Sequence, residues 1–151
     1  MGLTCTLHAL SEEDASFLLA GNREHQPRIL DSCELDKAWG AIHYFISGSS
    51  AVNPGNPEAK DFLLSGMTIE DMEGVTIHTC IAVAAFANQV TSITSEQLMS
   101  RFDPDRMNEE KVYLEPWDES GREYVLQFIE PFRRFIVAAA DAKRAVLVVI
   151  C

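Results

Sequence analysis

Three residues in the first third of the chain have side chains suited to a small-molecule site. Asp36, Trp39 and His43 bring together a carboxylate, an indole and an imidazole. Residues three and four apart lie on one side of a helix, so these side chains are expected to be neighbours, with Trp117 at the edge of the site. They form a candidate pocket for a small enzyme or a small-molecule-binding protein. The alternative, with Trp39 as a core anchor and His43 as its half-buried neighbour, stays open.

A second candidate site is an acidic surface between residues 103 and 119. Carboxylates and aromatic side chains alternate there, and its members are Asp103, Asp105, Glu109, Glu110, Tyr113, Glu115, Trp117 and Asp118. Opposite charge speeds the encounter with a basic partner, and aromatic residues commonly form the desolvated centre of an interface. In the alternative interpretation the carboxylates only keep the protein soluble, and Trp117 packs under a helix.

Cysteine and histidine residues occur in two pairs that could supply zinc ligands. The pairs are Cys5-x-x-His8 and His78-x-Cys80. Residues three apart on a strand point to opposite faces, so Cys5 and His8 would not share a metal. We therefore predict no metal site and interpret the four cysteines as reduced thiols, mostly in the core. The chain has no GxxxxGKS/T or GxGxxG sequence, and we predict neither a cofactor nor a catalytic residue.

The candidate pocket depends on an amphipathic helix that we predict from Asp31 to Gly48. Asp31 followed by Glu34 resembles a capping box, and Gly48 marks the C-terminal end of the helix. Apolar residues recur at intervals of three and four, which places them on one buried side of the helix. These residues are Leu35, Ala38, Trp39, Ile42, Phe45 and Ile46.

The other elements follow from alternation, helical spacing and capping residues. Ser11 caps a short helix, Pro57 begins another that includes Phe62, and Thr94 with Gln97 forms a capping box. Pro131 lies inside the longest helical pattern, which we expect to be one kinked helix or two helices in line. The ranges are strands at 3–9, 75–79 and 145–150, helices at 81–93 and 121–142, a helical turn at 104–108 and an acidic turn at 68–74.

Strands at both ends of the chain, with mostly helices between them, favour an α+β fold. We predict a single, mostly helical domain over residues 1–151, with a small sheet that includes the N- and C-terminal strands. A chain of 151 residues is long enough to bury a substantial core without a second domain.

The net charge of −11 restricts the classes of partner. An acidic surface repels phosphate groups, so nucleic-acid binding and docking to anionic membranes are both disfavoured. No segment has the pattern of a signal peptide or a membrane span, and we expect a cytoplasmic protein. A basic protein partner is compatible with this charge.

Four segments of the chain together resemble a bacterial protein family. In order they are LDKAWGAIHYFISG from Leu35, RFDPDRMNEEKVYLEPW from Arg101, EYVLQFIEPFRRFIVAAA from Glu123 and the final RAVLVVI. In content and order they are similar to the YfbM-like family, a domain of unknown function numbered 1877. The resemblance covers most of the chain and implies a single α+β domain. It implies no particular activity.

From the charge and the missing catalytic motifs we expect a non-enzymatic cytoplasmic binding protein. Its most concrete form is an immunity-type protein that neutralises a cognate basic toxin through the acidic surface. The alternative is the small enzyme or small-molecule-binding protein with its pocket near Asp36, Trp39 and His43.

Overall fold

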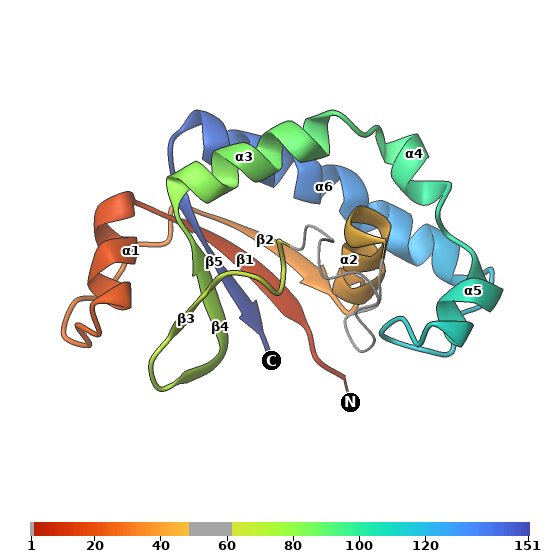
Figure 1. The fold of residues 1–151 in the computed structure, drawn as a ribbon, viewed down its shortest axis with the longest axis horizontal. Helices are drawn as coiled ribbons and strands as arrows, with labels where there is room; N and C mark the ends of the chain where they lie inside the picture. The colour runs from red at the N-terminus through yellow and green to blue at the C-terminus, as the bar shows by residue number, and fades with distance from the viewer. Residues whose placement is uncertain (1, 49–61) are drawn as a thin grey trace.

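Alternating apolar residues form strands that pair into one sheet in the computed structural model, which describes residues 2–48 and 62–151 (Figure 1). The described strands lie in the order β2-β1-β5-β4-β3, and every neighbouring pair is antiparallel. The first and last strands share this sheet, as predicted, and the structure shows that they are neighbours in it. The bounds are β1 Cys5–Leu10, β2 Asp31–Asp36, β3 Met67–Ile69, β4 Met72–His78 and β5 Ala145–Ile150.

The described residues also form six helices, two of which begin at the predicted caps Ser11 and Thr94. Ser11, Thr79 and Asp103 each accept a backbone N–H, and Thr94 with Gln97 completes the predicted capping box. None of these helices is long and apolar enough to span a membrane. The bounds are α1 Glu12–Leu19, α2 Trp39–Ser47, α3 Cys80–Thr91, α4 Ser95–Met99, α5 Pro104–Glu109 and α6 Gly121–Asp141.

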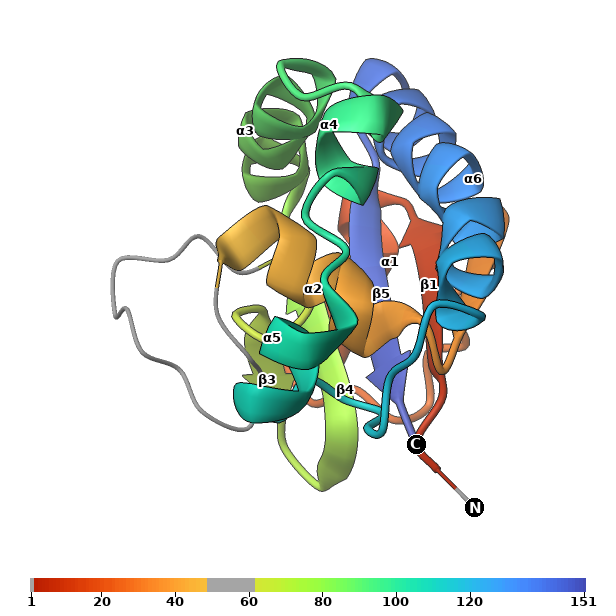
Figure 2. The ribbon, with the colours of Figure 1, turned by 90° about the vertical axis from the view of Figure 1, so that its right-hand side faces the viewer.

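The two faces of the sheet are covered differently. Cys5, Leu7 and Ala9 alternate along β1 toward the larger core, which also takes the buried residues of α2, α3 and α6. On the opposite face, Leu10 and Leu147 belong to a smaller cluster with α1. Figures 1 and 2 show α3 and α6 over the sheet, with α1 and α5 at opposite ends of the long axis. The structure confirms the predicted α+β class.

The predicted helix from Asp31 to Gly48 is wrong in its first part. Residues Asp31–Asp36 form the edge strand β2, and α2 begins only at Trp39. Cys33 and Leu35 are buried while Ser32 and Glu34 are exposed, which is the alternation of a strand. Pairing with β1 decides the outcome, because the short segment satisfies both a helical and an alternating pattern.

Two further predictions concern the proline-containing segments. Pro131 lies within one helix, α6, rather than between two. The predicted start of a helix at Asn56 and Pro57 lies outside the described residues, and Phe62 to Leu64 form a turn. Residues Val112 to Leu114 form an irregular crossing that belongs to no helix or strand.

Candidate functional site

A cavity of about 710 Å³ opens on the face of the sheet that α2, α3 and α6 cover, near the start of β1 and the end of β5. Hydrogen bonds between Thr4 and Cys151, at 2.7 and 3.0 Å, hold these two chain segments together. The cavity wall is largely apolar and aromatic. Its apolar and aromatic members are Leu3, Trp39, Leu63, Leu64, Tyr113 and Ile150.

Trp39 and Tyr113 form the aromatic part of this wall. Their rings stack with centroids 4.9 Å apart, and both donate to the carbonyl oxygen of Leu3, at 3.0 Å from Trp39 Nε1 and 3.1 Å from the Tyr113 hydroxyl. A Cβ atom at Gly40 would lie 2.2 Å from the Tyr113 carbonyl oxygen, so only glycine allows this close approach. The wall is therefore a fixed structure that joins three distant segments.

The structure does not bring Asp36, Trp39 and His43 into one pocket. Only Trp39 lines the cavity. The Tyr124 hydroxyl donates to Asp36 at 2.6 Å, and burial followed by this bond raises the pKa of Tyr124 to about 12. His43 is 4% exposed, so it is a core residue rather than a half-buried one, and its Nε2 lies 3.3 Å from the Ser47 hydroxyl.

The predicted acidic surface has its centre at α5. Asp103, Asp105, Glu109 and Glu110 border a shallow depression of about 610 Å³ together with one cation, Arg106. Arg106 Nε pairs with Glu110 at 2.9 Å. Asp103 also accepts the backbone N–H of Arg106 as the N-cap of α5. We call these five residues the α5 acidic surface, and its formal charge is −3 because four carboxylates face one guanidinium.

The aromatic residues predicted for this surface lie elsewhere. Trp117 is only 9% exposed, packs edge-on against Phe102 and donates its indole N–H to the Val112 carbonyl at 2.9 Å. Asn108 holds the Trp117 backbone through two hydrogen bonds, at 2.8 and 2.6 Å. Tyr113 lines the cavity. Trp117 is therefore placed as a core residue, the alternative given above, and not as an exposed anchor.

Two remaining members of the predicted surface are exposed. Glu115 lies on the irregular crossing after Tyr113. Asp118 accepts the Ser120 backbone N–H at 2.9 Å, and hydrogen bonds from the Ser120 hydroxyl and this N–H lower the pKa of Asp118. The carboxylate of Asp118 therefore stabilises the turn that leads into α6.

The thiols and histidines considered for a metal site are separated. Burial raises the pKa of Cys5 to about 12 and that of Cys33 to about 11, so both thiols stay protonated. His8 Nδ1 lies 2.7 Å from the Ser32 hydroxyl, and His78 Nε2 lies 2.5 Å from the Phe62 carbonyl oxygen. The described residues contain no cluster of three or more histidine, cysteine, aspartate or glutamate side chains that could hold a metal ion.

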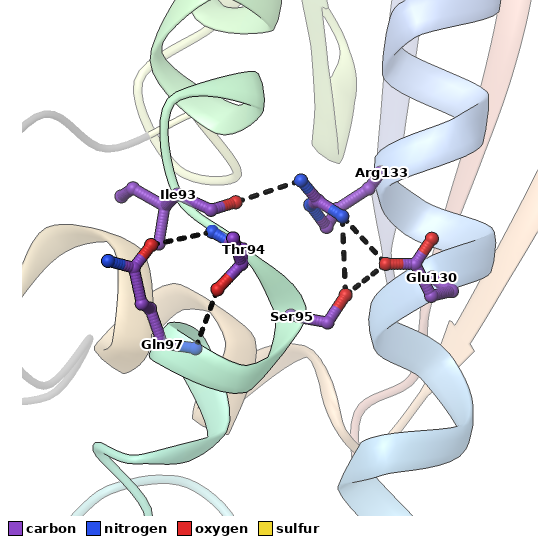
Figure 3. Close-up of polar contacts among 6 residues, drawn as sticks. All are labelled: Ile93, Thr94, Ser95, Gln97, Glu130 and Arg133. Carbon is purple, nitrogen blue, oxygen red and sulfur yellow. Dashed lines mark hydrogen bonds and ion pairs between the residues drawn. The ribbon is translucent and has the colours of Figure 1, made fainter.

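A polar network joins α4 to α6 and belongs to neither candidate site (Figure 3). Arg133 contacts Glu130 at 2.6 Å, the Ser95 hydroxyl at 3.3 Å and the Ile93 carbonyl at 2.9 Å. Its Nε atom is buried without a hydrogen-bond partner among the described residues. The network ties the start of α4 to the middle of α6, so we assign it a structural role.

Sequence reasoning missed most of the cavity wall. Leu3, Leu63 and Ile150 belong to no motif, and their types are those of ordinary core residues. One signal was available, because the first and last strands were predicted to share a sheet, and their pairing in the structure brings the segments of Leu3 and Ile150 together. Nothing in the sequence indicated that Tyr113 would pack against Gly40.

Comparison with known proteins places this architecture in a family. Residues 1–149 match the family described as Domain of unknown function (DUF1877). The chain belongs to this family. Its fold is similar to the crystal structure of YfbM from Escherichia coli, a protein of unknown function, with a TM-score of 0.70 and 18% sequence identity. The match covers 98% of this chain and 99% of that chain. No match was found among curated proteins. The resemblance drawn from the sequence is confirmed, and the DUF1877 match adds no activity.

Proposed function

We propose that this DUF1877 protein is a non-enzymatic cytoplasmic binding protein that holds a basic protein on its α5 acidic surface. Its most concrete form is an immunity-type inhibitor that covers the active site of a cognate toxin. The observation that carries the proposal is the gathering of four carboxylates around a single guanidinium in one depression. A basic protein would gain both electrostatic steering and charge pairing at such a surface.

The individual carboxylates differ in how free they are to meet a partner. Asp103 caps α5 and Glu110 pairs with Arg106, so both already have partners within the protein. Asp105 and Glu109 are exposed, and neither side chain has a hydrogen bond or ion pair recorded among the described residues. These two residues are therefore the sharpest probes of the surface, because changing them leaves the start of α5 intact.

The proposal is tested first by affinity capture of the tagged protein from its own host at low and high salt. We expect one stoichiometric basic protein that is released by salt. Its affinity is then measured for the double variant Asp105→Lys, Glu109→Lys, which should bind at least about tenfold more weakly and with a smaller salt dependence. Failure to recover a basic protein would contradict the proposed function.

A matched control makes the same change in charge at the other end of the molecule. Glu24 and Asp141 are exposed. Glu24 follows α1, which lies at the opposite end of the long axis from α5 (Figure 1), and Asp141 is the last residue of α6. The double variant Glu24→Lys, Asp141→Lys should keep most of the affinity, because exposed charges beyond the Debye length of about 8 Å are screened. If both double variants weaken binding equally, only net charge matters and the α5 acidic surface is not the interface.

A further inference from the structure

We propose that the cavity at Trp39 binds a small organic cation with an apolar body, such as an arylalkylammonium compound. This inference is independent of the protein partner proposed above, because the cavity and the α5 acidic surface share no residue. It rests on three properties of the cavity. The cavity has the size of a ligand pocket and an exposed apolar wall, the N–H and O–H groups of its aromatic residues are already hydrogen-bonded within the protein, and its charged side chain is a carboxylate.

The size and the apolar surface of the cavity fit a small molecule. Its volume of about 710 Å³ lies in the range of ligand pockets, about 300–1,000 Å³. Two of its wall residues expose much of their apolar surface, with Leu3 49% and Leu64 39% exposed. An apolar body that covers these side chains removes their surface from water, and that removal favours binding.

The aromatic donors in the wall are not available to a ligand. Trp39 Nε1 and the Tyr113 hydroxyl both donate to the Leu3 carbonyl oxygen. A ligand therefore meets ring atoms rather than N–H and O–H groups, and chiefly those of Tyr113, because Trp39 is only 5% exposed. Aromatic rings attract organic cations through the negative charge of their faces, which favours an ammonium group over a neutral polar group.

Among the described residues that line this cavity, Glu73 is the only one with a charged side chain, and none of them is a lysine, arginine or histidine. Glu73 lies on β4 next to Gly74, whose positive φ of 76° interrupts the regular strand at this point. A carboxylate or phosphate ligand would lose its hydration here without gaining an opposite charge. An ammonium group gains Glu73 as its counter-ion.

The experiment uses the full chain and three probes that share one apolar body: 4-phenylbutylammonium, 4-phenylbutanol and 4-phenylbutanoate. Calorimetry gives the affinities, and the two tryptophan indole N–H signals in ¹⁵N NMR report the position. We expect the ammonium compound to bind best and the carboxylate worst. The Trp39 signal should shift on binding while the Trp117 signal stays in place, because Trp117 does not line the cavity.

Glu73→Gln tests the charge, with Glu70→Gln as its control on the neighbouring exposed turn. Glu73→Gln should weaken binding of the ammonium compound about two- to fivefold and leave the alcohol unchanged, as expected for an ion pair with the exposed Glu73 side chain. Glu70→Gln should alter neither. The proposal is overturned if no probe binds saturably, if the carboxylate binds as well as the ammonium compound, if the Trp39 signal does not move, or if the two variants behave alike.

Discussion

At the scale of single residues, the two tryptophans show how side chains that suggest a binding site can be used for packing. Each indole donates its N–H to a backbone carbonyl, that of Leu3 for Trp39 and that of Val112 for Trp117. Both hydrogen bonds join segments that are not paired with each other as strands of the sheet. Trp39 still borders the cavity, whereas Trp117 closes the core beside Phe102.

Asn108 provides the first test at this scale. Asn108→Ala removes both hydrogen bonds to the Trp117 backbone, and it should lower the free energy of unfolding by about 1–3 kcal/mol. Urea denaturation followed by circular dichroism measures the change. Asn88→Ala is the control, since Asn88 is exposed on α3, and should stay within about 0.5 kcal/mol of the parent. Equal effects of the two substitutions would show that Asn108 does not secure Trp117.

At the scale of elements, side chains from one segment anchor the ends of another. Glu12 at the start of α1 accepts the backbone N–H of Cys80 at 2.5 Å, so its carboxylate lies at the N-terminus of α3. Arg133 ties α6 to the start of α4 in the network of Figure 3. These contacts satisfy backbone groups that a helix end or turn leaves without an intrahelical partner. The helices are therefore positioned by one another as well as by the core.

The loop after α1 is tied back to the helix by a carboxylate, which predicts a specific pH dependence. The Arg28 backbone N–H and then His25 lower the pKa of Asp14, with contacts of 2.9 and 2.5 Å. Because the folded pKa is depressed, this stabilisation is present above the unfolded pKa and disappears as the pH falls through the folded value. Asp14→Asn should therefore be less stable than the parent near neutral pH.

Urea midpoints measured between about pH 7 and pH 2 check this expectation. The difference between the parent and Asp14→Asn should be constant near neutral pH and shrink below about pH 4. Asp141→Asn is the control, because no hydrogen bond of its carboxylate is recorded among the described residues. A difference for Asp14→Asn that does not change with pH would mean that the lost contacts, and not the charge, are responsible.

At the scale of the whole molecule, acidic charge is spread over a surface with few cations. The chain has 23 acidic and 12 basic residues, and ion pairs among the described residues are few and mostly exposed. Exposed ion pairs contribute little to stability, so net repulsion dominates the long-range electrostatics. The α5 acidic surface is a local concentration of this general charge.

Net repulsion predicts that salt stabilises the protein. Raising sodium chloride from about 10 to 300 mM shortens the Debye length from about 30 Å to below 10 Å and weakens repulsion among the excess carboxylates. The thermal denaturation midpoint should therefore rise, as measured by circular dichroism. The double variant Glu24→Lys, Asp141→Lys reduces the net charge and should show a smaller rise. A fall in the midpoint would mean that ion pairs outweigh repulsion.

Local patterns in the sequence were sufficient for the elements that depend on near neighbours. Thr94 and Gln97 formed the expected capping box, and the terminal strands formed where they were predicted, because capping and strand patterns act over a few residues. The same kind of reasoning was wrong for Asp31–Asp36. That segment satisfies a helical spacing and a strand alternation, and its pairing with β1 decided between them.

The candidate sites depended much more on tertiary packing. The α5 carboxylates were recognisable in advance, because consecutive charged residues around a helix cap stay in solvent wherever the helix lies. The cavity was not recognisable, since Leu3, Trp39 and Tyr113 meet only when β1 is paired and the Tyr113 carbonyl packs against Gly40. Contacts between residues as far apart as Leu3 and Tyr113 leave no periodicity in the chain. The sign of the surface charge follows from composition, whereas the shape of a pocket follows from which distant side chains the fold places together.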